Sequence, residues 1–280
     1  MNQSMITASV TMGQLQRKLD TISHNIANTN TTGFKSREAT FSDLLFQQVN
    51  NQSREEYEVG RLTPNGIRVG TGAKIAQTAV RQDVGALMQT ERQLDFALTE
   101  KNHFFRIETV ENGAPVERIT RDGAFYLTEN PNNAQQLSLV TANGDFVLNG
   151  EGNRIAIPAN FQSISFSQDG ELEVTLRDGT MQNVGQLGLT NVLKPQLLDS
   201  VGNNLYRFPD LQALGFAVAD VRADFAGNGQ QVNQGFLEGS NVDLSREMNA
   251  LIEAQRHYQF NSRSISMADE MSGLVNGLRR

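Results

Sequence analysis

The chain contains no cysteine and no tryptophan among its 280 residues, and it has only six prolines. Without cysteine it can form no disulfide bond and can offer no thiolate ligand to a metal ion. No run of about 18 apolar residues occurs, so the sequence predicts no membrane-spanning helix and no membrane insertion. The start of the chain lacks a basic region followed by an apolar core, and we therefore expect no cleaved secretory signal.

Charge and hydrophobicity narrow the class of protein further. The formal net charge is -7, which provides no basic surface for nucleic acid or for an anionic membrane. Apolar residues make up 38% of the chain, below the usual share of a globular protein, and there are 24 glycines. These proportions favour an elongated or multi-part protein, rich in turns, over a protein with a single thick core.

The familiar patterns of catalytic and metal-binding residues are also missing. The three histidines, His24, His103 and His257, are far apart and lack the spacing of metal ligands. No Gly-x-Ser-x-Gly, His-Glu-x-x-His or Asp-x-Asp-x-Asp-Gly pattern occurs, and residues 70–72 lack the partners that complete a phosphate-binding loop. We therefore predict no catalytic residue, no cofactor and no metal site, and we interpret the protein as a non-enzyme.

A strict apolar repeat near the start predicts one long helix from Met5 to Asn28. Its apolar residues follow alternating steps of three and four: Met5, Ala8, Met12, Leu15, Leu19, Ile22 and Ile26. The remaining positions are mostly polar, so the apolar stripe is narrow. Such a helix is marginal alone and needs a partner that covers the stripe.

A second long helical pattern begins after Asn241. Residues at helical spacing form its predicted seam: Leu244, Met248, Leu251, Tyr258, Ile265, Met271 and Leu278. Asp243 is well placed to cap the helix, because its carboxylate can accept hydrogen bonds from free N–H groups of the first turn. This helix can partner the first one, either within one chain as a hairpin or between copies of the chain.

The region between the helices predicts an arm followed by a β-rich domain. We expect residues 31–69 to connect the parts, with residues 34–46 forming a short helix or an extended arm and residues 50–60 an exposed loop. From residue 70 to 240, Asn-Gly and Asp-Gly pairs recur at the positions that favour hairpin turns. Residues 171–176 alternate, which places Leu172, Val174 and Leu176 on one strand face.

The predicted fold class is therefore α+β. Residues 1–30 and 241–280 are expected to form a discontinuous, coiled-coil-like helical domain built from both chain ends. Residues 70–240 are expected to form an inserted, all-β antiparallel outer domain.

Motifs at both ends of the chain resemble the bacterial flagellar rod and hook proteins. Residues 23–35 resemble the N-terminal signature of that family, and residues 237–243, followed by Glu247-Met248, resemble its other end. Residues 66–72 and 85–90 resemble the distal rod branch more than the hook branch, and residues 120–125 are similar to a motif shared by both. One departure is visible, because Lys101-Asn102-His103 stands where relatives usually carry Gly-x-Gly before the paired Phe104-Phe105. The motif residues that the resemblance singles out are Asn25, Ala27, Asn28, Asn30, Thr32, Gly33, Phe34, Lys35, Glu238, Gly239, Ser240 and Asn241.

The resemblance implies a structural subunit of the flagellar basal body, most similar to the distal rod. Such a subunit would self-assemble into a hollow helical drive shaft that transmits torque to the hook. The implied partners are copies of the chain, neighbouring rod and hook subunits and the flagellar export apparatus. The resemblance also favours packing of the helical seams between copies over packing within one chain.

Other functions stay open at this point. Proximal rod and hook subunits of the same family are alternatives. An enzyme acting on cell-wall glycan would use two carboxylates of the β domain, although Glu171 and Glu173 on one strand face have no partner that the sequence can name. An adhesin or binding module on a coiled-coil stalk is a further alternative, in which self-association would not require both chain ends.

Overall fold

The computed structural model describes residues 3–43, 46–49, 67–70, 73–130, 133–167, 169–226 and 231–278. The predicted α+β class is confirmed, because a long helix near each end of the sequence brackets a region of antiparallel sheets. The chain divides into two compact units. Unit 1 comprises Met1–Ala27, Arg37–Ala79 and Asp243–Arg280, and unit 2 comprises Asn28–Ser36 and Val80–Val242. The predicted domain boundaries and the coiled coil stay predictions.

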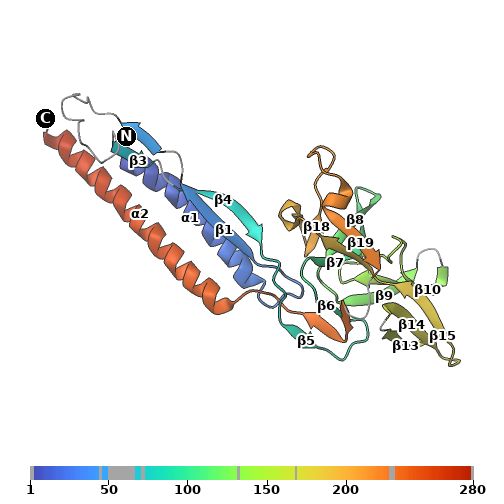
Figure 1. The fold of residues 1–280 in the computed structure, drawn as a ribbon. Helices are drawn as coiled ribbons and strands as arrows, with labels where there is room; N and C mark the ends of the chain where they lie inside the picture. Colours follow the sequence, from blue (N-terminus) through green and yellow to red (C-terminus); the bar gives the residue numbers. More distant parts are fainter. Residues whose placement is uncertain are drawn as a thin grey trace, which may run out of the picture. The chain divides into compact units, whose positions relative to one another are not determined.

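Unit 1 is built on two helices that run antiparallel, α1 (Gln3–Ala27) and α2 (Leu244–Leu278). Figure 1 shows them side by side, with the beginning of α1 and the end of α2 at the same end of the pair. Asp243 caps α2 as predicted, since its Oδ1 accepts hydrogen bonds from the backbone N–H groups of Ser245 (2.9 Å) and Arg246 (3.2 Å). In this structure α1 thus packs along α2 of the same chain.

Two short ribbons complete the described part of unit 1. Strands β1 (Arg37–Asp43) and β4 (Ala73–Val80) pair with each other, and β2 (Phe46–Val49) pairs antiparallel with β3 (Ile67–Gly70). Of the two alternatives for residues 34–46, the described part takes the extended one, since β1 is a strand. The loop expected at residues 50–60 and part of the glycine-rich stretch at 70–72 lie outside the described residues.

Unit 2 contains the rest of the strands and two short 3-10 helices. Its elements are β5 (Leu87–Gln89), β6 (Phe96–Leu98), β7 (His103–Glu111), β8 (Ala114–Thr120), β9 (Phe125–Asn130), β10 (Asn133–Thr141), β11 (Phe146–Val147), β12 (Ala156–Pro158), β13 (Phe161–Phe166), β14 (Glu171–Leu176), β15 (Met181–Gln186), β16 (Gly188–Val192), η2 (Pro195–Leu197), β17 (Asp199–Gly202), β18 (Leu205–Arg207), η3 (Val218–Asp220), β19 (Arg222–Ala226), β20 (Val232–Gln234) and β21 (Phe236–Glu238). A ten-stranded sheet has the central order β12-β10-β11-β7-β8-β18-β17, while β13-β14-β15 form a separate sheet. The last two strands of unit 2 pair with two of its first strands: β20 pairs with β6, and β21 pairs with β5.

Several predicted hairpin turns are present. Asn112 and Gly113 join β7 to β8 with φ angles of 53° and 81°, the positive values that a two-residue hairpin turn requires. Asp-Gly pairs also join β13 to β14 and β14 to β15. The Asp122-Gly123 pair has another role than a hairpin turn. A Cβ on Gly123 would lie 1.7 Å from the carbonyl oxygen of Phe96. There glycine permits close approach of two backbones.

The main hydrophobic core lies in unit 2 and is centred on packed phenylalanines. The ring of Phe125 lies 5.2 Å from that of Phe105 and 6.0 Å from that of Phe96, and all three side chains are fully buried. Leu172 and Val174 are buried in the same core, which confirms the predicted inner face of β14. The departure before Phe104-Phe105 is accommodated by Asn102, which adopts a φ of 62° and so takes a left-handed conformation that suits glycine or asparagine.

Candidate functional site

The seven predicted seam residues of α1 lie on one face of the helix. Ala8, Leu15 and Ile22, spaced seven apart, are buried. The other four, Met5, Met12, Leu19 and Ile26, are half-buried. The sequence therefore identified the covered face of α1 correctly as a geometric feature, while its role in assembly stays a prediction.

The predicted seam of α2 is covered over only part of its length. Leu251, Tyr258 and Ile265 are half-buried and lie on the same face as the buried Ala254. Leu244, Met248, Met271 and Leu278 are exposed instead, with exposed fractions of 44, 47, 61 and 89%. The structure does not bring these four together with the α1 seam.

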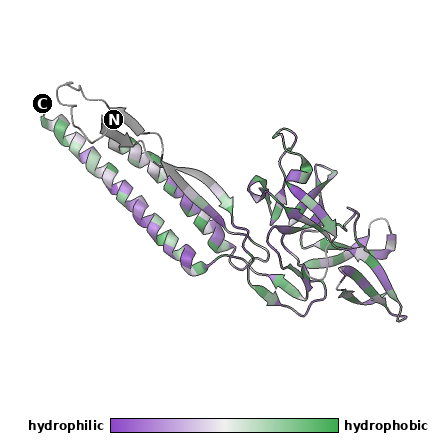
Figure 2. Cartoon of the chain, in the orientation of Figure 1, coloured by the Kyte–Doolittle hydropathy of each residue, from purple (hydrophilic) through white to green (hydrophobic). Residues whose placement is uncertain are grey.

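The second half of α2 carries an apolar stripe on the face opposite Ala254. At about 100° per residue, five large side chains fall on this outer face. They are Phe260, Met267, Met271, Leu274 and Leu278, and each is exposed by at least 59%. Hydrophobic residues are visible along this end of the helix in Figure 2. Their spacing of seven, four, three and four is the sequence signal that could have revealed Phe260, Met267 and Leu274 as a second stripe.

Among the motif residues, Asn25 lies in unit 1 and connects its elements. The buried Asn25 side chain donates from Nδ2 to the carbonyl of Arg37 (2.8 Å) and to Glu247 Oε1 (3.2 Å). Its Oδ1 accepts from the backbone N–H of Arg37 (3.0 Å). One amide thus ties α1 to β1 and to the first turns of α2, and Ala27 ends α1 two residues later.

The next motif residues shape the entry of the chain into unit 2. Asn28 accepts the backbone N–H of Thr31 at 3.2 Å on its carbonyl, which closes a turn, while Asn30 is exposed. The Thr32 hydroxyl donates to Asp122 Oδ1 at 2.9 Å. Gly33 has a φ of +65°, and a Cβ there would lie 2.6 Å from the backbone nitrogen of Asp122. Only glycine meets both demands, which explains its place in the motif.

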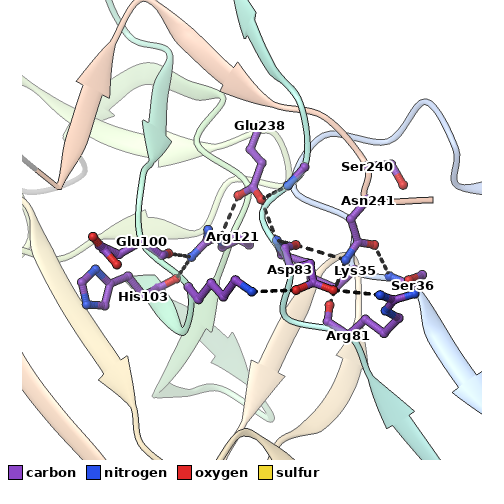
Figure 3. A network of polar contacts seen from close by, with 12 residues as sticks. Lys35, Ser36, Arg81, Asp83, Glu100, His103, Arg121, Glu238, Ser240 and Asn241 are labelled. Carbon is purple, nitrogen blue, oxygen red and sulfur yellow. Dashed lines mark hydrogen bonds and ion pairs between the residues drawn. The ribbon is translucent and has the colours of Figure 1, made fainter. Parts of the chain in front are cut away.

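Beyond this turn, three fully buried charged side chains of unit 2 meet, Lys35, Arg121 and Glu238, and we call this cluster the charged centre. Glu238 Oε1 lies 2.6 Å from Lys35 Nζ, and Glu238 Oε2 lies 2.7 Å from Arg121 Nε. All three side chains are exposed by only 1%. Figure 3 shows Glu238 between the two cations. Each of its oxygens therefore serves a different charged partner.

Backbone groups complete the coordination of these charges. Lys35 Nζ also donates to the carbonyl of Asp83 (2.7 Å), and Glu238 Oε1 accepts from the backbone N–H of Gly85 (2.8 Å). Arg121 Nη1 donates to the carbonyls of Glu100 (2.8 Å) and His103 (2.5 Å). Removing charges from water costs several kcal/mol each, and pairing with added hydrogen bonds offsets that cost only when the geometry is good.

The pKa of Lys35 reflects this burial. The pKa of Lys35 is lowered from 10.5 to about 8, first by removal from water and second by the neighbouring Arg121 guanidinium, whereas Glu238 acts in the opposite direction. Burial, followed by the charge of Arg121, likewise lowers the pKa of His103. The cost of burial thus outweighs the attraction of Glu238 for the Lys35 ammonium.

Asn241 forms a second polar layer beside the charged centre. Its Oδ1 accepts from the backbone N–H of Ser36 (2.7 Å), and its Nδ2 donates to the carbonyls of Arg81 (2.9 Å) and Asp83 (3.1 Å). The Ser240 hydroxyl accepts from the backbone N–H of Val242 at 3.3 Å. Figure 3 shows Asn241 beside Lys35 and Ser36.

The remaining motif residues, Phe34 and Gly239, fix the backbones around this layer. Phe34 is buried, and its carbonyl accepts from the backbone N–H of Asn241 at 3.4 Å. Gly239 donates its N–H to the carbonyl of Ala86 at 2.8 Å. A Cβ on the facing Gly85 would lie 2.0 Å from the carbonyl oxygen of Gly239. The two segments therefore approach more closely than any side chain at residue 85 allows.

The structure thus gathers motif residues 33–35 and 238–241 and adds Arg121, Asp83 and Gly85. Two of these additions had a signal in the sequence, because Arg121 and Gly85 lie in the family-like stretches at 120–125 and 85–90. Asp83 contributes mainly a backbone carbonyl, which the side-chain sequence does not reveal. The arrangement is suited to holding segments together, since both oxygens of its carboxylate are already engaged.

In the part of the chain that the structure describes, no three acidic or histidine side chains are grouped so as to hold a metal ion. Within the same residues, no helix combines the length and the apolar character needed to cross a membrane.

We call Lys35, Arg121, Glu238 and Asn241 together the buried joint. The fold and this joint define an α+β structural protein in which buried polar side chains hold backbone segments together. Three family models match the chain: "Flagella basal body rod protein" at residues 5–35, "Flagellar hook protein FlgE/F/G D1 domain" at 100–174, and "Flagellar basal body rod FlgEFG protein C-terminal" at 233–278. The chain belongs to the flagellar basal-body rod and hook protein family. It is therefore a structural component of the bacterial flagellum.

Relatives align with the chain over its whole length. It is 40% identical over 281 residues to the flagellar hook-basal body complex protein FlhP of Bacillus subtilis, covering 100% of both chains. It is 35% identical over 280 residues to the flagellar basal-body rod protein FlgG of the same organism, again covering 100% of both. FlgG of Caulobacter vibrioides is 33% identical over 279 residues, covering 99% of each chain.

Proposed function

We propose that the protein is a subunit of the flagellar rod, and specifically of the distal rod, that assembles with copies of itself into a hollow helical shaft. The observation that carries this proposal is the end-to-end similarity to basal-body rod proteins named FlgG. The shaft would transmit torque to the hook. Its further partners would be neighbouring rod and hook subunits and the flagellar export apparatus.

The outer face of α2 is the surface we assign to contacts between copies. The α1 seam already lies against α2 within the chain, so a second apolar surface is needed for association. Phe260, Met267, Met271, Leu274 and Leu278 supply it. Burial of each large side chain favours association by about 1.5–3 kcal/mol before ordering costs are deducted. In a helical assembly this outer face would meet a different surface of the next copy, because only such a heterologous contact can repeat along an axis.

A hook subunit of the same family is the second candidate. It is favoured by the similarity to a relative named as a hook-basal body complex protein, whose identity of 40% is higher than the 35% found for FlgG of the same organism. Both candidates are structural subunits of the same axial assembly. They differ in the position of the chain along the flagellar axis.

Electron microscopy of purified basal bodies tests the proposal and separates the two candidates. The host strain would carry this chain with an epitope inserted in the exposed hairpin turn at Asp178-Gly179, detected with a gold-labelled antibody fragment. Label along the distal part of the rod supports the distal rod. Label along the attached hook supports the second candidate, and basal bodies without label contradict both.

A further inference from the structure

Three stretches of unit 2 meet at its charged centre, and each lies next to a point where the chain enters or leaves this unit. They are residues 33–36, 81–85 and 238–241, which we call the exit segments. Unit 2 has its limits at Asn28, Ser36, Val80 and Val242, and the exit segments lie next to the last three of these. The exit segments are distant in sequence, since Lys35 and Glu238 are 203 residues apart.

Two side chains of the last exit segment each contact both of the others. Asn241 binds the backbone of Ser36 in the first exit segment and of Arg81 and Asp83 in the second. Glu238 binds the Lys35 ammonium of the first and the Gly85 N–H of the second, and it also holds Arg121. The same three segments are therefore cross-connected twice, once by an amide and once by a carboxylate (Figure 3).

Backbone hydrogen bonds between the segments add to these contacts. Gly33 N–H donates to the carbonyl of Glu238 (2.8 Å), and Arg81 N–H donates to the carbonyl of Ser36 (2.9 Å). Displacing any one segment would leave buried donors or acceptors unpaired on the other two. A buried polar group without a partner is costly, so partial opening is disfavoured relative to complete opening.

We propose that Asn241 and Glu238 form a clamp that makes the three exit segments of unit 2 open and close as one cooperative unit. The consequence for function rests on the rod assignment made above. In a subunit under torsional load, tension that reaches unit 2 through one exit segment is then resisted by the hydrogen bonds of all three.

Amide hydrogen exchange on the full-length protein, followed by mass spectrometry, tests the clamp. The reporting amides are those of Gly33, Ser36, Arg81, Gly85 and Gly239, each of which donates across exit segments or to the neighbouring Ala86. In the unaltered protein we expect them to share one opening free energy. In Asn241→Ala we expect exchange to accelerate by a similar factor, roughly tenfold or more, in all three exit segments.

Two further variants complete the exchange experiment: a matched control, and a milder substitution of Asn241 that keeps one of its three hydrogen bonds. Asn149→Ala removes two side chain to backbone hydrogen bonds within an exposed turn of unit 2, and we expect it to accelerate exchange only near residues 149–153. Asn241→Asp keeps the acceptor for Ser36 N–H and loses both donated bonds. A cooperative clamp responds to this variant in all three segments as well, even if Asn241→Ala fails to fold.

Acceleration confined to residues 239–241 in either variant would overturn the clamp. This outcome is independent of the rod assignment, because exchange is measured on the isolated protein. Failure of the rod assignment would instead appear as basal bodies without label.

Discussion

At the scale of single residues, Glu238 sets the balance of charge inside unit 2. It is bonded to both Lys35 and Arg121, and all three side chains are buried. A buried ion pair is weak evidence for stability as such, but the loss of one partner leaves an uncompensated charge. The effect of substitution at Glu238 should therefore be far larger than at an exposed glutamate.

Replacing Glu238 by glutamine should destabilise unit 2 by roughly 3–5 kcal/mol, because two buried cations lose their counter-ion while the volume of the side chain is kept. Urea unfolding followed by circular dichroism measures the change. Glu91→Gln, at an exposed position, is the matched control and should change the free energy of unfolding by less than about 0.5 kcal/mol. Equal midpoints for the two variants would contradict a charge-balancing role.

Lys35 should give unit 2 a dependence on alkaline pH. Its pKa is about 8 in the folded protein and 10.5 as the ordinary value, so between these pH values the unfolded chain holds more protons. Stability must then rise with pH across this window, because the cost of the buried charge is full below about pH 8 and is relieved above it. Lys35→Met lacks this group.

The free energy of unfolding of the unaltered protein, minus that of Lys35→Met, should therefore increase from pH 8 to 10.5 by an amount on the order of 3 kcal/mol. Urea titrations at four pH values in this window provide the measurement. A difference that stays flat or falls with pH would show that Lys35 keeps its proton over the whole window.

At the scale of elements, α2 has two faces with different surroundings. One face contains the buried Ala254 and lies on the α1 side, while the outer face exposes Phe260, Met267 and Met271. Substitutions on the two faces should therefore have separable effects on folding and on association.

Leu15→Asp should place a carboxylate in the buried face between the helices and reduce helix content, since an unpaired charge is disfavoured there. Met271→Asp, at a position 61% exposed, should keep the helix content and abolish association between copies. Circular dichroism reports the first effect and sedimentation velocity the second. An outer-face variant that still assembles would show that another surface makes the contact.

The periodicity of the sequence predicted local features well. The seam face of α1, the cap at Asp243 and the hairpin at Asn112-Gly113 each depend on residues close in sequence, so spacing and turn chemistry were sufficient. The two stripes of α2 could not be assigned, because one sequence pattern does not say which stripe meets α1. The buried joint could not be predicted from the sequence either. Lys35, Arg121 and Glu238 are far apart in the sequence, and only the strand order of unit 2 brings them together.

At the scale of the whole molecule, unit 2 is discontinuous in sequence, because residues 28–36 join residues 80–242. A fragment of residues 70–240 lacks both Lys35 and Asn241, whereas a fragment of residues 28–242 contains the complete joint. We expect the longer fragment to unfold in one cooperative thermal transition and the shorter one to lack such a transition. Calorimetry of both fragments gives the answer, and a cooperative transition of the shorter fragment would show that the joint is dispensable for folding.

The separation of 203 residues between Lys35 and Glu238 also has a kinetic meaning. A ribosome delivers Lys35 and Arg121 long before Glu238, so the growing chain holds two cations whose counter-ion has not yet been made. Contacts between such distant positions form late and slowly, because a large loop must close first. Unit 2 can therefore complete its folding only after residue 238 has been synthesised and has reached Lys35 and Arg121.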